Sequence, residues 1–153
     1  MAPAITDAVA VDVAGIAHAR FSRLRTAFSK VDADLASSPA FLQGRQGRSY
    51  FGPVYLVRGS EPHMTIAVPI EPFAGNVIGV LVAQVNLKYI NEVVSDIKIG
   101  KAGYAYAVTR SGDLIAHPDV SLVLQARNVA QLSHIKTAFQ SSANTAKPSA
   151  TVS

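Results

Sequence analysis

Residues 103–119 read GYAYAVTRSGDLIAHPD, which is the most informative pattern in the chain. Two short runs of β-forming residues, Tyr104 to Val108 and Asp113 to His117, flank a polar turn that ends in Gly112. A glycine at such a position between two apolar runs predicts a β-hairpin. Asp119 follows the second run, where an aspartate is favoured as the cap of a helix.

The residues before this hairpin predict an antiparallel meander. Tyr50 to Val57, Met64 to Ile70 and Val77 to Leu87 are rich in aromatic and β-branched residues, which favours strands. Polar segments that contain Gly or Pro, residues 58–62 and 71–76, separate the three strands as turns.

The N-terminal part predicts a further hairpin and helices. Thr6 to Val13 and Ile16 to Ser22 read as two strands on either side of a glycine-containing turn. Apolar residues at spacings of three and four predict a helix from Leu24 to Leu35. Ser38 and Pro39 favour the start of a short helical piece through Leu42, and residues 44–47 read as a loop.

Helices also follow the meander and the hairpin. Tyr89 to Ile97 places its apolar residues on one face, and Leu122 to Phe139 is broadly helical. From Ser141 the chain is rich in small and polar residues, which predicts a disordered tail over residues 141–153. The sequence thus predicts an α+β fold: a five-stranded antiparallel sheet flanked by helices, and then an incomplete second unit.

Composition narrows the possible functions. The chain has 153 residues, 49% of them hydrophobic and 16% charged, a formal net charge of +4 and no cysteine. Its cations are scattered, without the clustered stripe typical of nucleic-acid binding, so no nucleic-acid partner is expected. The N-terminus lacks the pattern of a signal peptide, and the longest nearly apolar run, residues 77–85, is too short to span a bilayer. Any membrane anchor is therefore expected outside this chain.

The sequence offers no catalytic or metal-binding pattern. Its four histidines have no metal-ligand spacing, and no serine stands in a nucleophile motif. The chain also lacks a glycine-rich phosphate loop of the known types. We therefore expect no cofactor, no metal and no enzymatic activity.

A ligand site is predicted around the first strand of the meander. Arg48, Tyr50, Tyr55 and Arg58 surround its two ends. Arginine binds carboxylates in a bidentate manner, so an anionic small ligand would suit these residues. In an unbroken strand Arg48 and Tyr50 share a face, whereas Tyr55 points to the other face unless a bulge intervenes. The alternative is that the arginines are solvated and the tyrosines belong to the core.

An ordered series of segments resembles a known family. It includes YFGPVY at residues 50–55, SEPHMTIAVP at 60–69, AQVNLK at 83–88 and IKIGKAGYAY at 97–106, and it ends in SGDLIAHPD at 111–119. This series resembles the double Cache, PAS-like sensor regions of bacterial histidine kinases, nucleotide cyclases and chemoreceptors. The resemblance covers about residues 6–139, most of the chain.

The resemblance implies a domain plan and a function. Residues 6–98 would form the membrane-distal PAS-like lobe, and residues 99–140 a partial membrane-proximal lobe. The module would sense a small molecule on the periplasmic side of the membrane as part of a receptor, and it would be able to form a homodimer. Relatives that bind amino acids carry an Arg-x-Trp element and a later Asp. This chain has no Trp, so the clamp for a free amino acid is incomplete. Asn86 stands at the place of the Asp and is a further ligand-binding candidate.

Two other functions stay open from the sequence. The chain could be a truncated, non-catalytic interaction fragment without a ligand. A small enzyme has the least support, because the sequence lacks a catalytic constellation.

Overall fold

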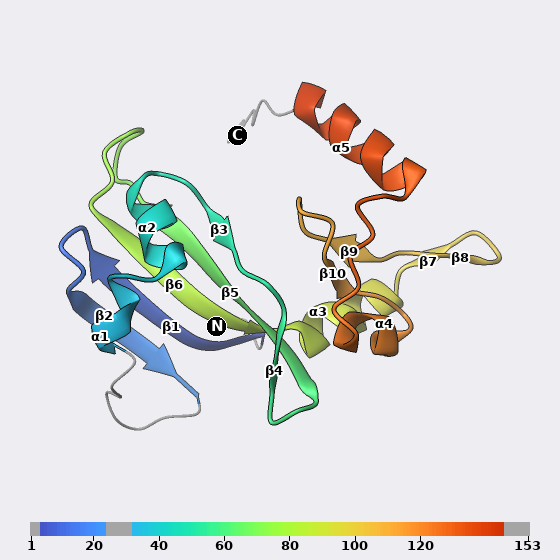
Figure 1. The fold of residues 1–153 in the computed structure, drawn as a ribbon, viewed down its shortest axis with the longest axis horizontal. Helices are drawn as coiled ribbons and strands as arrows, with labels where there is room; N and C mark the ends of the chain where they lie inside the picture. Colours follow the sequence, from blue (N-terminus) through green and yellow to red (C-terminus); the bar gives the residue numbers. More distant parts are fainter. Residues whose placement is uncertain (1–3, 24–31, 146–153) are drawn as a thin grey trace, which may run out of the picture.

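An antiparallel sheet forms the larger part of the molecule (Figure 1). The computed structural model describes residues 4–23 and 32–145. The sheet has the order β2-β1-β6-β5-β3, and β4 also pairs with β5. Its strands are β1 (Ile5–Asp12), β2 (Ala17–Ser22), β3 (Tyr50–Phe51), β4 (Tyr55–Val57), β5 (Glu61–Ile70) and β6 (Gly79–Asn86). All five strands predicted for this sheet are present, and the predicted α+β class is confirmed. The strand predicted over Tyr50 to Val57 is divided into β3 and β4, so the sheet has six strands.

The N-terminal helices lie on one face of this sheet (Figure 1). The described part of the helix predicted from Leu24 to Leu35 is α1 (Asp32–Leu35), and residues 24–31 lie outside the described residues. The short helix predicted at Ser38 is confirmed as α2 (Pro39–Arg45), because the Ser38 hydroxyl accepts a hydrogen bond from the Phe41 amide at 3.2 Å.

The loop predicted at residues 44–47 is wrong for its first two residues, because α2 continues to Arg45. Gly44 is buried against β6, and a Cβ atom at this position would lie 2.4 Å from Cγ1 of Val80. A glycine here therefore permits close packing between helix and sheet and does not end the helix.

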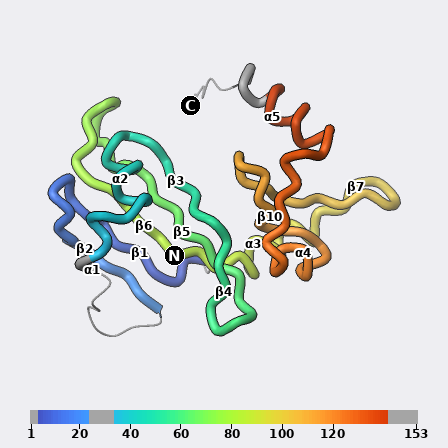
Figure 2. The backbone as a smooth tube through the Cα atoms, in the orientation of Figure 1, coloured from blue at the N-terminus to red at the C-terminus, as the bar shows by residue number. Residues whose placement is uncertain are grey.

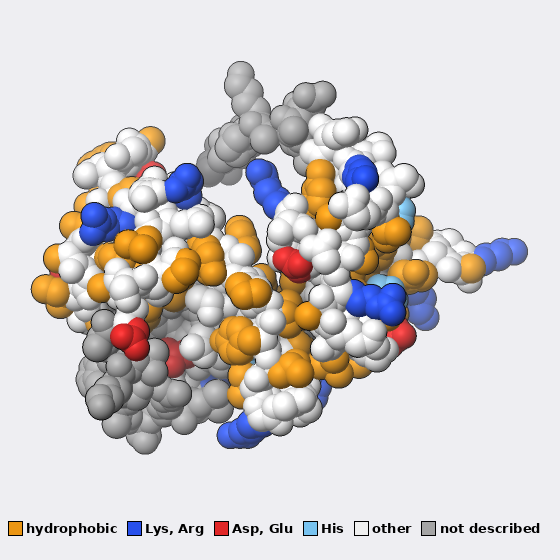
Figure 3. Space-filling model, viewed as in Figure 1, with side chains coloured by type: hydrophobic (Ala, Val, Ile, Leu, Met, Phe, Trp, Pro, Cys, Tyr) orange, Lys and Arg blue, Asp and Glu red, His pale blue; other side chains and the backbone are white. Residues whose placement is uncertain are grey.

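The core lies between α2 and the sheet. Phe41 is 1% exposed, and Val11, Ala67 and Val80 are at most 1% exposed on the sheet face that it covers. The other face carries exposed apolar side chains, among them Phe51, Val68 and Leu81. On the face that Figure 3 presents, hydrophobic side chains lie over both parts of the molecule, and the Lys and Arg side chains are scattered among the described residues.

Helix α3 (Leu87–Ser95) connects the sheet to the C-terminal part, as the tube in Figure 2 shows. This confirms the helix predicted at Tyr89 to Ile97, with both ends two residues earlier in the chain. The Asn91 side chain accepts a hydrogen bond from the His117 amide at 2.7 Å, so it links α3 to the segment that follows β10 (Leu114–Ala116).

The hairpin predicted within residues 103–119 exists but is shorter. β9 (Ala107–Val108) pairs with β10, whereas Tyr104 belongs to β8 (Gly103–Tyr104). β8 pairs with β7 (Lys98–Ile99) in a separate two-stranded sheet, which projects from the molecule (Figure 2). The predicted Asp119 cap is confirmed, because its carboxylate accepts a hydrogen bond from the Ser121 amide at 3.0 Å.

The segment from Leu122 to Phe139 is broadly helical, as predicted, but it is not one continuous helix. The chain instead forms α4 (Val120–Leu124) and α5 (Ser133–Thr145). Between them Ala126 has a positive φ of 49°, and the Asn128 side chain donates a hydrogen bond to the Asp113 carboxylate at 2.8 Å. The contact with the hairpin favours this break. Helix α5 also includes residues 141–145 of the predicted tail, and residues 146–153 lie outside the described residues.

Candidate functional site

An extra residue in the edge strand decides which side chains meet on the sheet. Tyr50 pairs with Ala67, and Tyr55 pairs with His63. The edge segment therefore advances five residues, from Tyr50 to Tyr55, while β5 opposite it advances four, from Ala67 to His63. One extra residue on one strand of a pair is a β-bulge. Directly paired residues share a face, so Tyr50 and Tyr55 lie on the same face. An unbroken strand would have placed them on opposite faces.

This face changes from apolar to polar along the strands. Under α2 a cross-strand row consists of Val9, Val82 and Ala67. The next row on the same face consists of Asp7, Gln84 and Thr65, and the last consists of Asn86, His63 and Tyr55. Polar groups on an otherwise buried face require hydrogen-bond partners, which makes the last two rows the candidate site.

A first cavity lies over the middle row. It has a volume of about 220 Å³, and its polar lining comes from Asp7, Asp34, Ser38, Thr65 and Gln84. We call it the helix-side cavity, because Asp34 and Ser38 come from α1 and from the start of α2. The Asp7 carboxylate lies 3.4 Å from Nε of Arg20, and both side chains are largely buried.

Tyr55 lies beside this cavity. Burial raises the pKa of its phenol, and the negative charge of Asp7 raises this pKa further, while a hydrogen bond with Thr65 lowers it. The phenol is therefore a neutral hydrogen-bonding group at the edge of the helix-side cavity.

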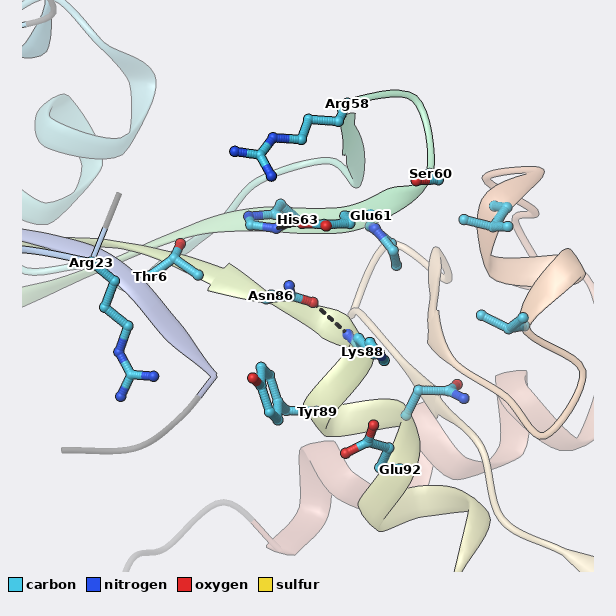
Figure 4. A pocket seen from close by; sticks show the side chains of 14 residues that line it. Thr6, Arg23, Arg58, Ser60, Glu61, His63, Asn86, Lys88, Tyr89 and Glu92 are labelled. Atoms are coloured by element: carbon cyan, nitrogen blue, oxygen red, sulfur yellow. Dashed lines mark hydrogen bonds and ion pairs between the residues drawn. The ribbon is translucent and has the colours of Figure 1, made fainter. Parts of the chain in front are cut away.

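A second and larger cavity lies over the last row, and we call it the junction cavity. It has a volume of about 780 Å³ and lies where the ends of β5 and β6 meet α3 and α4. Figure 4 shows His63 and Glu61 next to each other on β5, Asn86 on β6, and Tyr89 and Glu92 on α3. Arg58 lies above His63 in this view, on the turn between β4 and β5.

The structure separates the residues that the sequence predicted as one site. Arg58 and Asn86 line the junction cavity, and Asn86 also caps α3 through a hydrogen bond from the Lys88 amide to Oδ1 at 2.9 Å. Tyr55 contacts His63 with ring centroids 6.1 Å apart. Tyr50 packs against the core. Arg48 is exposed, donates a hydrogen bond to Gln46 and lines neither cavity.

Sequence reasoning missed four residues of the two polar rows: Asp7, His63, Thr65 and Gln84. The signal was present in the alternation of β5, where every second residue back from buried Ala67 faces the core. Thr65 and His63 are the polar residues at these positions. In the part of the chain that the structure describes, no three His, Asp or Glu side chains come together as a metal site.

Comparison with known proteins identifies the family. A family model described as a Cache domain matches residues 4–151. The methyl-accepting chemotaxis protein PscA of Pseudomonas syringae pv. tomato is 33% identical over 67 residues, which are 44% of this chain and 10% of PscA.

Two solved structures share the fold. The ligand-binding domain of the Pseudomonas aeruginosa amino acid chemoreceptor PctC, in complex with GABA, has a TM-score of 0.53 at 20% identity, over 84% of this chain and 55% of the other. The ligand-binding domain of the Pseudomonas fluorescens chemoreceptor CtaA, in complex with L-serine, has a TM-score of 0.51 at 20% identity, over 78% of this chain and 51% of the other.

The chain spans about half the length of these two ligand-binding domains and a tenth of PscA. None of the helices among the described residues is long and apolar enough to cross a membrane. The match over residues 4–151 covers nearly the whole chain, so this protein belongs to the Cache domain family, whose members are extracellular sensor domains of receptors.

Proposed function

We propose that this chain is the ligand-sensing part of a bacterial membrane receptor. The observation that carries this proposal is a cavity lined by polar side chains on the helix-covered face of a Cache sheet. Residues 6–98 would form the membrane-distal lobe that holds the ligand, and residues 99–140 part of the proximal lobe. The module would lie on the periplasmic side of the membrane as part of this receptor.

The helix-side cavity supports a small ligand that donates hydrogen bonds. Its lining includes the carboxylates of Asp7 and Asp34, the hydroxyl of Thr65 and the amide of Gln84. Carboxylates accept hydrogen bonds from ammonium groups, so an amine-bearing molecule fits this cavity better than the anion expected from the arginines. Of the two arginines predicted for the site, Arg58 lines the junction cavity and Arg48 lines neither cavity.

Helix α3 supports a path for the signal. It follows directly from β6 and is bound to the hairpin segment through Asn91 and His117. A ligand that shifts the polar rows would therefore act on the C-terminal part through α3. Coupling of this kind is typically worth about 1–3 kcal/mol. We propose a binding module that acts in a receptor, as a homodimer.

A binding screen tests this function. Amines such as GABA, L-serine and putrescine are added to the chain, and thermal unfolding is recorded. A ligand at a hundred times its dissociation constant stabilises the native state by about 2.7 kcal/mol. Asp34→Asn and Thr65→Val should abolish the shift, whereas the exposed Asp96→Asn, outside both cavities, should retain it. If no small molecule shifts the transition, the chain is an interaction fragment without a ligand.

A further inference from the structure

His63 is a buried polar side chain without a hydrogen-bond partner. It is 1% exposed, and neither ring nitrogen has a hydrogen-bond partner among the described residues. The nearest acidic oxygen, Oε2 of Glu61, lies 3.7 Å from Nε2, beyond hydrogen-bond distance. Because buried polar groups in native proteins are nearly always hydrogen-bonded, this ring indicates a missing partner.

The ring lies in the wall of the junction cavity. The volume of about 780 Å³ is within the range of small-molecule sites, which is about 300–1,000 Å³. Its walls come from both parts of the molecule: the sheet supplies His63 and Asn86, and α4 supplies Val120 and Leu124. The cavity therefore has an apolar side, a polar side and the room for a ligand.

The charges around the cavity favour an anion. Three cations line it, Arg23, Arg58 and Lys88, against the two carboxylates of Glu61 and Glu92. The Arg58 and Lys88 side chains form no ion pair with another described residue, whereas Glu61 is directed at His63 (Figure 4). The turn that carries Arg58 has a positive φ of 52° at this residue, a conformation uncommon outside glycine.

We propose that the junction cavity is a second ligand site, which binds a small organic carboxylate through His63 and Arg58. Arg58 would contact the carboxylate from the turn, and a guanidinium suits this bidentate contact. A protonated His63 would donate one N–H to the ligand and the other to Glu61, so that both ring nitrogens gain acceptors. The other groups beside the ring are neutral, Tyr55 from β4 and Asn86 from β6.

This site would act between the two parts of the chain. A carboxylate held by the sheet would extend toward Val120 and Leu124, so that its carbon skeleton packs against α4. Occupation would then fix the sheet relative to α4, whereas a ligand in the helix-side cavity contacts the sheet, α1 and α2. The two sites use different residues, so either can exist without the other.

Isothermal titration calorimetry on the full chain tests the proposal. The probes are acetate, succinate, citrate and benzoate, and succinamide serves as the uncharged control. We expect at least one carboxylate to bind and succinamide not to bind. Arg58→Gln and His63→Gln should each weaken binding at least tenfold, whereas Arg110→Gln, on the exposed turn before β10, should leave it unchanged.

Proton uptake gives a second readout. If His63 becomes protonated on binding, the apparent enthalpy depends on the ionisation enthalpy of the buffer, and this dependence is lost in His63→Gln. Arg58 is exposed, so Arg58→Gln keeps the test valid even if His63→Gln does not fold. The proposal is overturned if none of the four carboxylates binds, or if Arg58→Gln binds as tightly as the original chain. Thr65→Val separates the two sites, because it should impair amine binding and spare carboxylate binding.

Discussion

Tyr55 faces the same side of the sheet as Tyr50, although five positions separate them and an unbroken strand would turn them apart. The segment 52–54 adds one residue to the edge opposite β5, and its Gly52 amide donates a hydrogen bond to the Thr65 carbonyl at 2.8 Å. The two tyrosines nevertheless differ in role. Tyr50 packs against the core, whereas the Tyr55 phenol is hydrogen-bonded with Thr65.

This difference predicts unequal effects of removing the two hydroxyls. Tyr55→Phe should lower the free energy of unfolding by about 1 kcal/mol, because the Thr65 hydroxyl loses its partner. Tyr50→Phe, the matched control, should change it by less than about 0.5 kcal/mol. Urea denaturation of both variants measures the effects. Equal losses would contradict the different roles.

Gly44 provides a test of the packing between α2 and the sheet. Its missing Cβ leaves room for Val80, which is fully buried and stiff at χ1. Gly44→Ala should therefore destabilise the protein by about 1–3 kcal/mol, although alanine favours helices. Gln43→Ala, at an exposed position of the same helix, should be neutral or slightly stabilising. A stabilised Gly44→Ala variant would show that the space between α2 and Val80 of β6 has room for a methyl group.

The predictable parts of the fold are those with a local cause. Ser38 and Asp119 begin helices because their side chains accept backbone hydrogen bonds two or three residues later, and this depends on the sequence nearby. The break between α4 and α5 was not predictable, because Asn128 bonds to Asp113 across the hairpin, and periodicity contains no such contact.

The candidate site was also predictable only in part, because it depends on contacts between distant segments. Arg58 and Asn86 were recognisable as polar residues at strand ends, but their common cavity depends on how α3 and α4 pack. His63 was overlooked because its importance depends on burial and on the absence of a partner among the described residues. Arg48 was predicted from its place before the strand and from the affinity of arginine for carboxylates, but its side chain is exposed and lines neither cavity.

The hairpin network predicts acid sensitivity in the C-terminal part. Hydrogen bonds from Ser111 at 2.6 Å and from Asn128 at 2.8 Å hold the pKa of the Asp113 carboxyl below its usual value of 3.8. A carboxyl whose pKa is lower in the folded state stabilises that state above its unfolded pKa. This contribution is lost as the pH falls through the folded pKa. The free energy of unfolding should thus fall below about pH 4, where unfolded Asp titrates.

Nuclear magnetic resonance titration of the Asp113 carboxyl carbon checks this directly. The midpoint should lie below 3.8, and Asn128→Ala should raise it by removing one donor. In Asp113→Asn the loss of stability in acid should become smaller. Other carboxyls, such as Asp12 beside His18, still contribute to the remaining loss. A midpoint at or above the usual value would contradict the network.

The unpartnered ring of His63 predicts an unusual result for a core substitution. Most replacements of a fully buried side chain destabilise a protein, by about 0.5–3 kcal/mol. In the ligand-free chain, however, His63 bears the cost of two buried nitrogens without hydrogen bonds. Phenylalanine has a similar shape and no such groups, and an unsatisfied buried polar group costs about 1–3 kcal/mol. His63→Phe should therefore leave the free energy of unfolding unchanged or raise it by up to about 2 kcal/mol. The same variant should no longer bind carboxylates, so stability and binding would change in opposite directions.

Asn86→Leu is the contrasting variant, because it removes the cap of α3 and should cost about 1 kcal/mol. Guanidinium denaturation of both variants without ligand measures these changes. A loss of more than 1 kcal/mol in His63→Phe would mean that the imidazole is already hydrogen-bonded in the free protein, and the ring would then no longer point to a missing ligand.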